Sequence, residues 1–321
     1  MTTIILIPDE PKLDPATFRR ALPDYEIVPV PAGDPTALAE APDATAIVAH
    51  TNTPIPESVF EAHPNLQILA RLGTGVDNID VDAAAAHDVV VTNVPEYSTD
   101  EVATHALSLL LAVRRSLLEH DRAVASGDWD WTVGAPAPPL VGSTVGVVSF
   151  GSIAQRFVEL LEGFDVDVLV YDPYVDDETI VNAGARRVDF DGLLEAADAV
   201  SIHAPLTPET AGMFDADAFE RLPDHAVVVN VGRGGIIDQA DLRGALEAGS
   251  IAGAGLDVFE TEPPTDVALL ERGDVVCTPH SAWYSSASRQ RLNETAARNV
   301  AAALAGEQPP DVIPLEADWI A

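Results

Sequence analysis

With 321 residues, of which 47 % are hydrophobic, the chain is long enough for two domains with separate cores. Its 52 acidic residues outnumber 17 basic ones and give a formal net charge of −35, which argues against nucleic acid and anionic membranes as partners. Lys12 is the only lysine, so the composition predicts adaptation to a high-salt cytosol, where ions screen the repulsion between surface carboxylates.

Short apolar runs alternate with helical patterns in the first third of the chain. The expected strands are 4–7, 26–30, 46–49, 67–71 and 89–92. Helical patterns between them include 14–21 and 80–87. This alternation predicts a small α/β domain with a parallel sheet.

A longer helix is expected over 100–125, because apolar residues recur there at helical spacing and arginines gather near its end. The loop-rich segment 126–140 follows. It contains Trp129 and Trp131, and we expect it to pack on a partner or on another domain.

A second α/β series occupies most of the remaining chain. Its expected strands are 144–149, 166–171, 186–190, 199–203, 226–231, 254–258 and 275–278. A last helix, 288–305, lies beyond this series and could return to the first domain. The single cysteine, the lack of an apolar run near the ~20 residues that span a bilayer and the lack of a signal-peptide pattern predict a cytoplasmic protein.

A strand–turn–helix unit begins this second series. At the positions of the dinucleotide fingerprint G-x-G-x-x-G it has Ser149, Gly151 and Ala154. The central glycine lets the backbone approach a pyrophosphate, and alanine is small enough for the helix to pack on the sheet. Serine at the first position departs from the pattern.

Asp172 ends the next expected strand, about twenty residues further on. A carboxylate there accepts hydrogen bonds from the ribose hydroxyls of NAD and repels the 2′-phosphate of NADP. The residues that follow, 176–178, add no arginine that would reverse this choice. We therefore expect NAD; the alternative is that Asp172 is only a turn residue before Pro173.

Three further segments end expected strands: NVGRGG at 230–235, DVFETEP at 257–263 and TPH at 278–280. Open α/β sheets bind ligands at this edge. Reduction of a 2-keto acid needs a cation that holds the carboxylate and the carbonyl, for which Arg233 is suited, and a proton donor, for which His280 is suited. Glu262 would hold the imidazole of His280 in one orientation.

In this order and context the three segments resemble the D-isomer-specific 2-hydroxyacid dehydrogenase family, and the resemblance runs over essentially the whole chain. It implies an NAD-dependent oxidoreductase that interconverts 2-keto and D-2-hydroxy acids, has no metal and forms a homodimer through its cofactor domains. It also implies a Rossmann-type doubly wound parallel sheet, 100–286, inserted into a smaller flavodoxin-like α/β substrate domain, 1–99 plus 287–321. With its single lysine, the chain looks like a haloarchaeal member.

The resemblance also assigns residues to the site. The implied cofactor contacts are Gly151, Ser152, Ile153, Asp172, His203, Ala204, Pro205, Val231, Gly232, Arg233, Asp257 and His280. The implied substrate contacts are Thr74, Gly75, Val76, Arg233 and Trp283. Asp257 matches the family position that binds the nicotinamide carboxamide.

For some of these residues a plainer interpretation stays open. The segment 72–80, which resembles the family's substrate loop, could be an ordinary glycine-rich strand-to-helix turn, and His203 could be structural. Thr104 and His105 fall near where family members touch the cofactor, but both could be plain helix residues.

The segment HSAWYS at 280–285 resembles the branch of the family that includes the C-terminal-binding-protein corepressors, in which the tryptophan forms a wall of the substrate pocket. An indole at Trp283 would favour an apolar substrate side chain. Alternatively, Trp283 packs at a hinge between the domains.

The sequence also bears on three other functions. A corepressor-like scaffold would use NAD to set its oligomeric state, but Arg233, Glu262 and His280 are all retained and no peptide-recruiting extension is evident. Phosphoglycerate dehydrogenase activity is a further alternative, although the chain leaves no room for a regulatory domain and offers few cations for a phosphate. Formate dehydrogenases of this superfamily have glutamine in place of Glu262, so the glutamate favours hydroxyacid chemistry.

Overall fold

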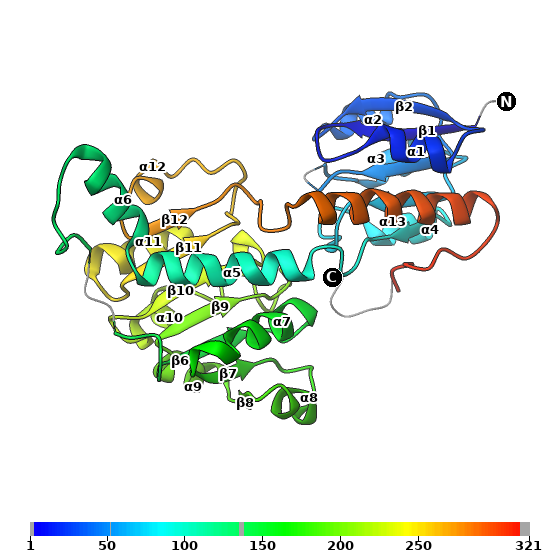
Figure 1. The fold of residues 1–321 in the computed structure, drawn as a ribbon. Coiled ribbons are helices and arrows are strands. Elements are labelled where there is room, and N and C mark those ends of the chain that lie inside the picture. The colour runs from blue at the N-terminus through cyan, green and yellow to red at the C-terminus, as the bar shows by residue number, and fades with distance from the viewer. Residues whose placement is uncertain (1–2, 52, 135–137, 315–321) are drawn as a thin grey trace. The chain divides into compact units, whose positions relative to one another are not determined.

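The computed structural model describes residues 3–51, 53–134 and 138–314 (Figure 1). The chain divides into two compact units. Unit 1 comprises Met1–Tyr97 and Tyr284–Ala321, and unit 2 comprises Ser98–Trp283. The expected domains, 1–99 plus 287–321 and 100–286, stay a prediction about which parts fold independently.

Unit 1 contains a parallel sheet with the strand order β2-β1-β3-β4-β5. The strands are β1 (Ile4–Asp9), β2 (Glu26–Pro31), β3 (Ala46–Ala49), β4 (Ile68–Arg71) and β5 (Val90–Thr92). The helices are α1 (Pro15–Ala21), α2 (Pro35–Ala39), α3 (Glu57–Ala62), α4 (Val81–Ala86) and α13 (Ser286–Leu304). Every residue of β3 and β4 is buried, as in a parallel sheet that helices cover on both faces.

The last helix belongs to unit 1, a possibility that the sequence suggests without deciding it. Ser285 begins α13 with a side-chain hydrogen bond to the backbone of the first turn. The helix contacts β3, β4 and β5, and α1 packs against it (Figure 1). Its buried side chains recur at helical spacing and include Leu292, Ala296 and Val300. Asn293 ties it to the start of α1, because its Oδ1 accepts the backbone N–H of Asp14 at 2.7 Å.

Unit 2 contains a larger parallel sheet with the strand order β12-β11-β10-β9-β6-β7-β8. The strands are β6 (Thr144–Val148), β7 (Asp167–Tyr171), β8 (Arg186–Arg187), β9 (Ala199–Ile202), β10 (Val227–Asn230), β11 (Gly253–Leu256) and β12 (Val275–Cys277). The α-helices are α5 (Thr99–Arg114), α6 (Leu117–Ser126), α7 (Ser152–Leu161), α8 (Asp177–Asn182), α9 (Phe190–Ala196), α10 (Ala216–Arg221), α11 (Gln239–Ala248) and α12 (Val267–Leu270).

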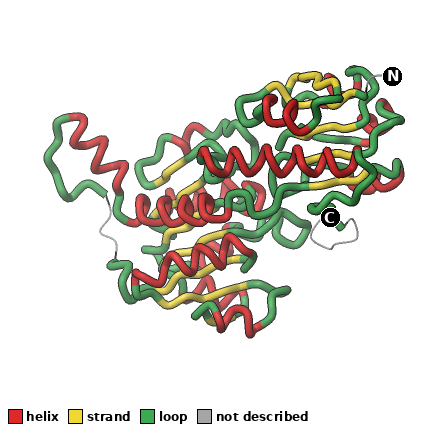
Figure 2. The backbone as a smooth tube through the Cα atoms, turned by 45° about the vertical axis from the view of Figure 1, so that its right-hand side comes forward, coloured by secondary structure: helices red, strands yellow, loops and turns green. Residues whose placement is uncertain are grey.

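Separate cores fill the two faces of this sheet, and Figure 2 shows helices on both sides of its strands. Alternate residues of one strand point into different cores. Val227 and Val229 of β10 join the core formed with α5 and α7, whereas Val228 joins the core formed with α9, α10 and α11. The structure therefore confirms the α/β fold with a doubly wound parallel sheet.

Two predicted elements of unit 2 are wrong. The single helix expected over 100–125 is divided into α5 and α6, because Ser116 between them adopts a left-handed conformation with φ +46° that a helix does not continue through. The strand expected over 186–190 ends at Arg187, since the side chain of Asp189 accepts the N–H of Gly192 and begins α9.

Helix α6 and the loop after it project from the rest of unit 2 in both views (Figures 1 and 2). None of the residues of α6 is buried. Trp129 and Trp131 in the loop are 92 % and 87 % exposed. Among the residues that the structure describes, no helix combines the length and the apolar character needed to cross a membrane.

Candidate active site

The predicted site residues of unit 2 lie at one edge of its sheet, because the carboxyl ends of parallel strands all lie at the same edge. Asp172 follows β7, Arg233 follows β10 and His280 follows β12. The strand order reverses between β9 and β6, and ligands of doubly wound sheets bind beside such a reversal.

The turn between β6 and α7 suits the pyrophosphate of a dinucleotide. Gly151 precedes the first residue of α7, and no side chain caps this end of the helix. Its uncapped N–H groups, including those of Ser152 and Ile153, are donors of the kind that bind phosphate. A Cβ atom at Gly151 would meet no protein atom within 4 Å, so the glycine leaves the approach to these donors clear. Ser149 adopts φ +69°, the left-handed conformation for which the fingerprint uses glycine.

Asp172 is 6 % exposed and is held by backbone donors. Its carboxylate accepts the N–H groups of Phe150 at 2.7 Å, Tyr174 at 2.8 Å and Val175 at 3.0 Å. These bonds fix the carboxylate at the end of β7, next to the turn that begins α7. Since a carboxylate has about four acceptor positions, little capacity is left for ribose hydroxyls unless some of these bonds rearrange.

Sequence reasoning missed an arginine at this position. The side chain of Arg187 donates to the backbone carbonyls of Asp172 and Val175 and pairs with Asp177. The residues that directly follow Asp172 contain no arginine, but β8 pairs with β7 and places Arg187 opposite Val170. Correct pairing of these two strands from the sequence would have found it.

His203 follows β9 and has the features of a structural residue. Its Nε2 lies 2.8 Å from the hydroxyl of Ser201, and its ring packs on Phe157 with centroids 5.3 Å apart. Burial lowers the pKa of His203 to about 3, so the imidazole is neutral at physiological pH. Ala204 is buried, and its carbonyl would lie 2.6 Å from a Cβ at Gly232, so the segments after β9 and β10 meet closely only because residue 232 is glycine.

The loop that holds Arg233 is fixed by its neighbours. The buried amide of Asn230 donates to the carbonyl of Arg233 at 2.9 Å and accepts the N–H of Gly232 at 3.0 Å. A Cβ at Gly234 would lie 1.9 Å from the carbonyl carbon of Phe259, so glycine is required for this loop to pack against the segment that contains Glu262. The guanidinium of Arg233 donates to the carbonyl of Gly232 at 3.0 Å.

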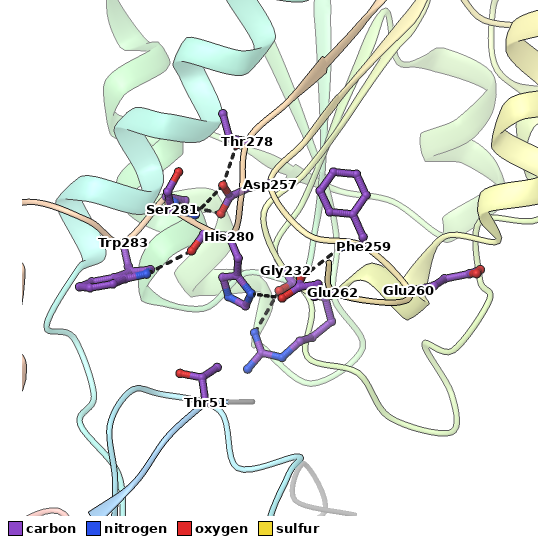
Figure 3. A network of polar contacts seen from close by, with 12 residues as sticks. Thr51, Gly232, Asp257, Phe259, Glu260, Glu262, Thr278, His280, Ser281 and Trp283 are labelled. Atoms are coloured by element: carbon purple, nitrogen blue, oxygen red, sulfur yellow. Dashed lines mark hydrogen bonds and ion pairs between the residues drawn. The ribbon is translucent and has the colours of Figure 1, made fainter. Parts of the chain in front are cut away.

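His280 and Glu262 form a direct pair (Figure 3). Nδ1 of His280 lies 2.8 Å from Oε2 of Glu262, which leaves Nε2 for another partner. Burial disfavours the ionised form of Glu262, but the hydrogen bond and charge of His280, the N–H of Phe259 and the charge of Arg233 together lower the pKa of its carboxyl group. The structure thus brings the predicted Arg233, Glu262 and His280 together.

The segment after His280 is held from two sides. Both carboxylate oxygens of Asp257 bind it: Oδ1 accepts the N–H of Ser281 at 2.8 Å, and Oδ2 accepts that of Ala282 at 2.9 Å. The indole N–H of Trp283 donates to the carbonyl of His280 at 3.1 Å (Figure 3). Asp257 and Trp283 therefore support the histidine, a role that the sequence did not indicate for either.

Pro205 follows β9 and Val231 follows β10 in unit 2, whereas the predicted Thr74, Gly75 and Val76 belong to unit 1 and follow β4. Asn93 donates to the carbonyl of Thr74 at 2.7 Å, and the backbone N–H of Val94 donates to the carbonyl of Gly73 at 2.9 Å. These bonds fix the turn and direct its carbonyl groups toward the two residues that follow β5. Within the described residues, no group of three or more His, Cys, Asp or Glu side chains could hold a metal ion.

Known proteins resemble the chain over nearly all of its length. It is 39 % identical over 311 residues to the D-3-phosphoglycerate dehydrogenase of Mycobacterium leprae, covering 97 % of this chain but 58 % of that protein. It is also 39 % identical to the glyoxylate reductase of Korarchaeum cryptofilum, covering 84 % of this chain and 83 % of that protein. The structure of an NADPH-dependent glyoxylate/hydroxypyruvate reductase from Sinorhizobium meliloti, in complex with NADP and malonate, matches with a TM-score of 0.86 and 32 % identity over 98 % of both chains.

One family accounts for these similarities and for the geometry of unit 2. Residues 107–282 match the family described as D-isomer specific 2-hydroxyacid dehydrogenase, NAD binding domain. This segment contains the uncapped turn at Gly151 and the group formed by Arg233, Glu262 and His280. The chain therefore belongs to the D-isomer-specific 2-hydroxyacid dehydrogenase family.

Proposed function

We propose that this protein is an NAD-dependent D-2-hydroxyacid dehydrogenase that reduces 2-keto acids, with Arg233, Glu262 and His280 as its catalytic residues. The observation that carries the proposal is the 2.8 Å pair between Nδ1 of His280 and Glu262, with the charge of Arg233 acting on the same carboxylate. The pair lies at the carboxyl edge of a sheet that belongs to an NAD-binding domain.

The residues divide the reaction between them. The nicotinamide cofactor supplies the hydride when it is bound. Arg233 holds the carboxylate of the 2-keto acid and polarises the carbonyl beside it. His280 donates a proton from Nε2 to the carbonyl oxygen as the hydride reaches the carbonyl carbon, and the product is the 2-hydroxy acid. Glu262 fixes the tautomer and the direction of the ring through Nδ1 and stabilises the imidazolium before transfer.

The remaining site assignments belong to the same proposal. The turn of Thr74, Gly75 and Val76 in unit 1 offers backbone N–H groups to the substrate carboxylate. Trp283 favours a substrate with an apolar side chain. The HSAWYS segment supports a relation to the branch that includes the C-terminal-binding proteins, and the single lysine supports a haloarchaeal source.

We propose that the cofactor is NAD rather than NADP. The carboxylate of Asp172 at the end of β7 would repel a 2′-phosphate, and the guanidinium of Arg187 beside it pairs with Asp177 and with backbone carbonyls. Asp172→Ala should raise kcat/KM for NADPH relative to NADH by about ten-fold or more, because the repulsion is removed. Initial rates with both cofactors measure this ratio; an unmodified protein that already prefers NADPH would contradict the assignment.

A panel of 2-keto acids tests the activity itself. The purified chain is assayed with NADH and with NADPH over a range of KCl concentrations, using acids with apolar, hydroxylated, carboxylated and phosphorylated side chains. Oxidation of NADH with an acid of the apolar group is the expected result. Absence of turnover with every acid at every salt concentration would reject the proposal. A stoichiometric NAD-dependent complex with another protein, formed without turnover, would favour a binding module instead.

Two further features of the proposal concern the whole protein. We propose a homodimer formed through unit 2, because Trp129, Trp131 and the apolar side chains of α6 are exposed next to one another in the chain. We also propose that the protein works in a high-salt cytosol, because its net charge of −35 requires screening.

A further inference from the structure

His280 has a backbone conformation that its surroundings must maintain. Its φ is +50°, in the left-handed region that residues with a side chain rarely adopt. The backbone N–H of His280 donates to the carbonyl of Asp257 at 2.8 Å. The orientation of the imidazole thus depends on groups that hold the loop from β11.

The side chain of Asp257 contributes two hydrogen bonds to this hold. It is 1 % exposed, and its oxygens accept the N–H groups of Ser281 and Ala282, the two residues after His280. A buried carboxylate is stable only when hydrogen bonds satisfy it, so the carboxylate and the loop fix each other.

A third group extends this arrangement to another element. The hydroxyl of Thr278 lies 2.6 Å from Oδ1 of Asp257, and Nε2 of His105 lies 2.9 Å from the same hydroxyl (Figure 3 shows Thr278 and Asp257). A hydroxyl has a single proton, and a carboxylate can only accept. Thr278 therefore donates to Asp257 and accepts from His105, so Nε2 of His105 must bear a proton.

The chain of bonds crosses a large sequence separation. His105 is on α5, 173 residues before Thr278. Its ring also lies 3.6 Å from Oδ1 of Asp257, and its side chain is 24 % exposed. Helix α5 packs on β10, β11 and β12, so it is a rigid support for the donor.

We propose that His105, Thr278 and Asp257 form a polar chain that positions His280 for proton transfer. His105 and Thr278 are positioning residues in this proposal, which rests on the proposed acid–base role of His280. Loss of the His105 donor or of the Thr278 hydroxyl leaves Asp257 less restrained. The loop 280–282 then samples other conformations, and the imidazole spends less time directed at the substrate.

The test uses paired variants of the full-length protein. Thr278→Val removes the hydroxyl at nearly constant shape, and Thr278→Ser restores it. His105→Leu removes the donor, and His105→Gln restores an N–H at a similar distance. Ser108→Ala, an exposed residue one turn further along α5, is the control for a substitution in this helix.

Two readouts separate positioning from general destabilisation. Because a misplacement of about 1 Å can cost about 10²-fold, Thr278→Val and His105→Leu should lower kcat by about 10- to 100-fold, with KM and the NADH dissociation constant nearly unchanged. Thr278→Ser and His105→Gln should recover most of the loss. Hydrogen exchange of the amides in 278–283 should become faster in the two damaging variants, while exchange in β10 stays the same.

The His280→Ala background decides whether the chain acts through the histidine. In this background Thr278→Val should cause almost no further loss of kcat, because the effects of substituting groups that act as one unit are not additive. A further full loss in this background would overturn the proposal, as would unchanged exchange of the loop amides in both damaging variants. Exchange does not depend on turnover, so a wild-type protein without activity would reject the proposed function while exchange still tests the positioning chain.

Discussion

His280 is the residue on which the proposed proton transfer depends. We expect His280→Ala to lower kcat by about 10²–10⁴-fold, the usual effect of losing a general acid. NADH binding, measured by fluorescence, should change little, because the uncapped N–H groups of α7 that suit the pyrophosphate follow a different strand. Glu262→Gln keeps a hydrogen-bond acceptor for Nδ1 of His280 but removes the charge. It should therefore lower kcat less than His280→Ala does. A His280→Ala variant as active as the parent would remove this residue from the mechanism.

His203 predicts a pH dependence of stability. Its folded pKa of about 3 lies below the ordinary value of 6.5 because burial disfavours the charged ring. The unfolded chain therefore binds a proton that the folded chain does not. The free energy of unfolding should fall as pH decreases from about 6.5 toward 3, by at most about 1.4 kcal/mol per pH unit from this residue.

Chemical unfolding at several pH values in constant KCl measures this slope. His203→Gln should reduce it, since glutamine does not titrate and its amide can bond the Ser201 hydroxyl. The control is His120→Gln, which removes a histidine from α6, a helix that buries none of its residues. Equal slopes in the parent and in His203→Gln would contradict the assignment.

The sequence names candidate site residues where the proposed chemistry restricts the choice. Arg233, Glu262 and His280 could be named because each has a distinct role and follows an expected strand. Ser149 shows the limit: its backbone keeps the left-handed conformation although glycine is absent, which the residue type does not predict. The Arg187 side chain was missed because its position depends on the pairing of β7 with β8, which no local pattern encodes.

At the scale of elements, strands were easier to predict than the ends of helices. Buried parallel strands are short runs of apolar residues, and β3, β9 and β10 match the expected segments closely. The division between α5 and α6 was not predictable from periodicity. Apolar residues continue at helical spacing across Ser116, but the backbone leaves the helical conformation there. The return of α13 to unit 1 could only be suggested, since packing between distant segments decides it.

The projecting α6 and its loop lead to a prediction about assembly. Leu117 and Val124 are 52 % and 56 % exposed, and Trp129 and Trp131 are almost fully exposed. Large aromatic side chains in such a segment are typical of residues that a second chain covers. We expect the protein to migrate as a dimer of 33.8 kDa chains in high salt, by light scattering after gel filtration.

Replacement of both tryptophans by serine should shift the dimer toward monomer by at least about ten-fold in dissociation constant, because two aromatic contacts are lost. The control is Tyr174→Ser, which removes another exposed aromatic residue at a different place on unit 2. A dimer of unchanged stability in the double variant would exclude this segment from the interface, and a monomeric parent protein would reject the homodimer.

At the scale of the molecule, some of the carboxylates have local roles. Side chains of aspartate cap helix N-termini throughout both units, where they accept backbone N–H groups and lie at the positive end of the helix dipole. The capping residues are Asp14, Asp34, Asp80, Asp176, Asp189, Asp215, Asp238 and Asp266. These caps are a minority of the 52 acidic residues, so most of the negative charge lies elsewhere and is not explained by helix capping.

That remaining charge makes stability depend on salt. With a net charge of −35, the folded chain repels itself more than the expanded unfolded chain does, and ions reduce this difference. The Debye length falls from about 10 Å at 0.1 M to about 3 Å at 1 M, so the urea midpoint of unfolding should rise steeply over this range and more slowly above it.

Screening depends on ionic strength, so KCl and tetramethylammonium chloride should act alike up to about 1 M. A urea midpoint that does not change between these concentrations would contradict the proposed adaptation, and a rise with sulfate but not with chloride would assign the effect to ion exclusion from the surface instead.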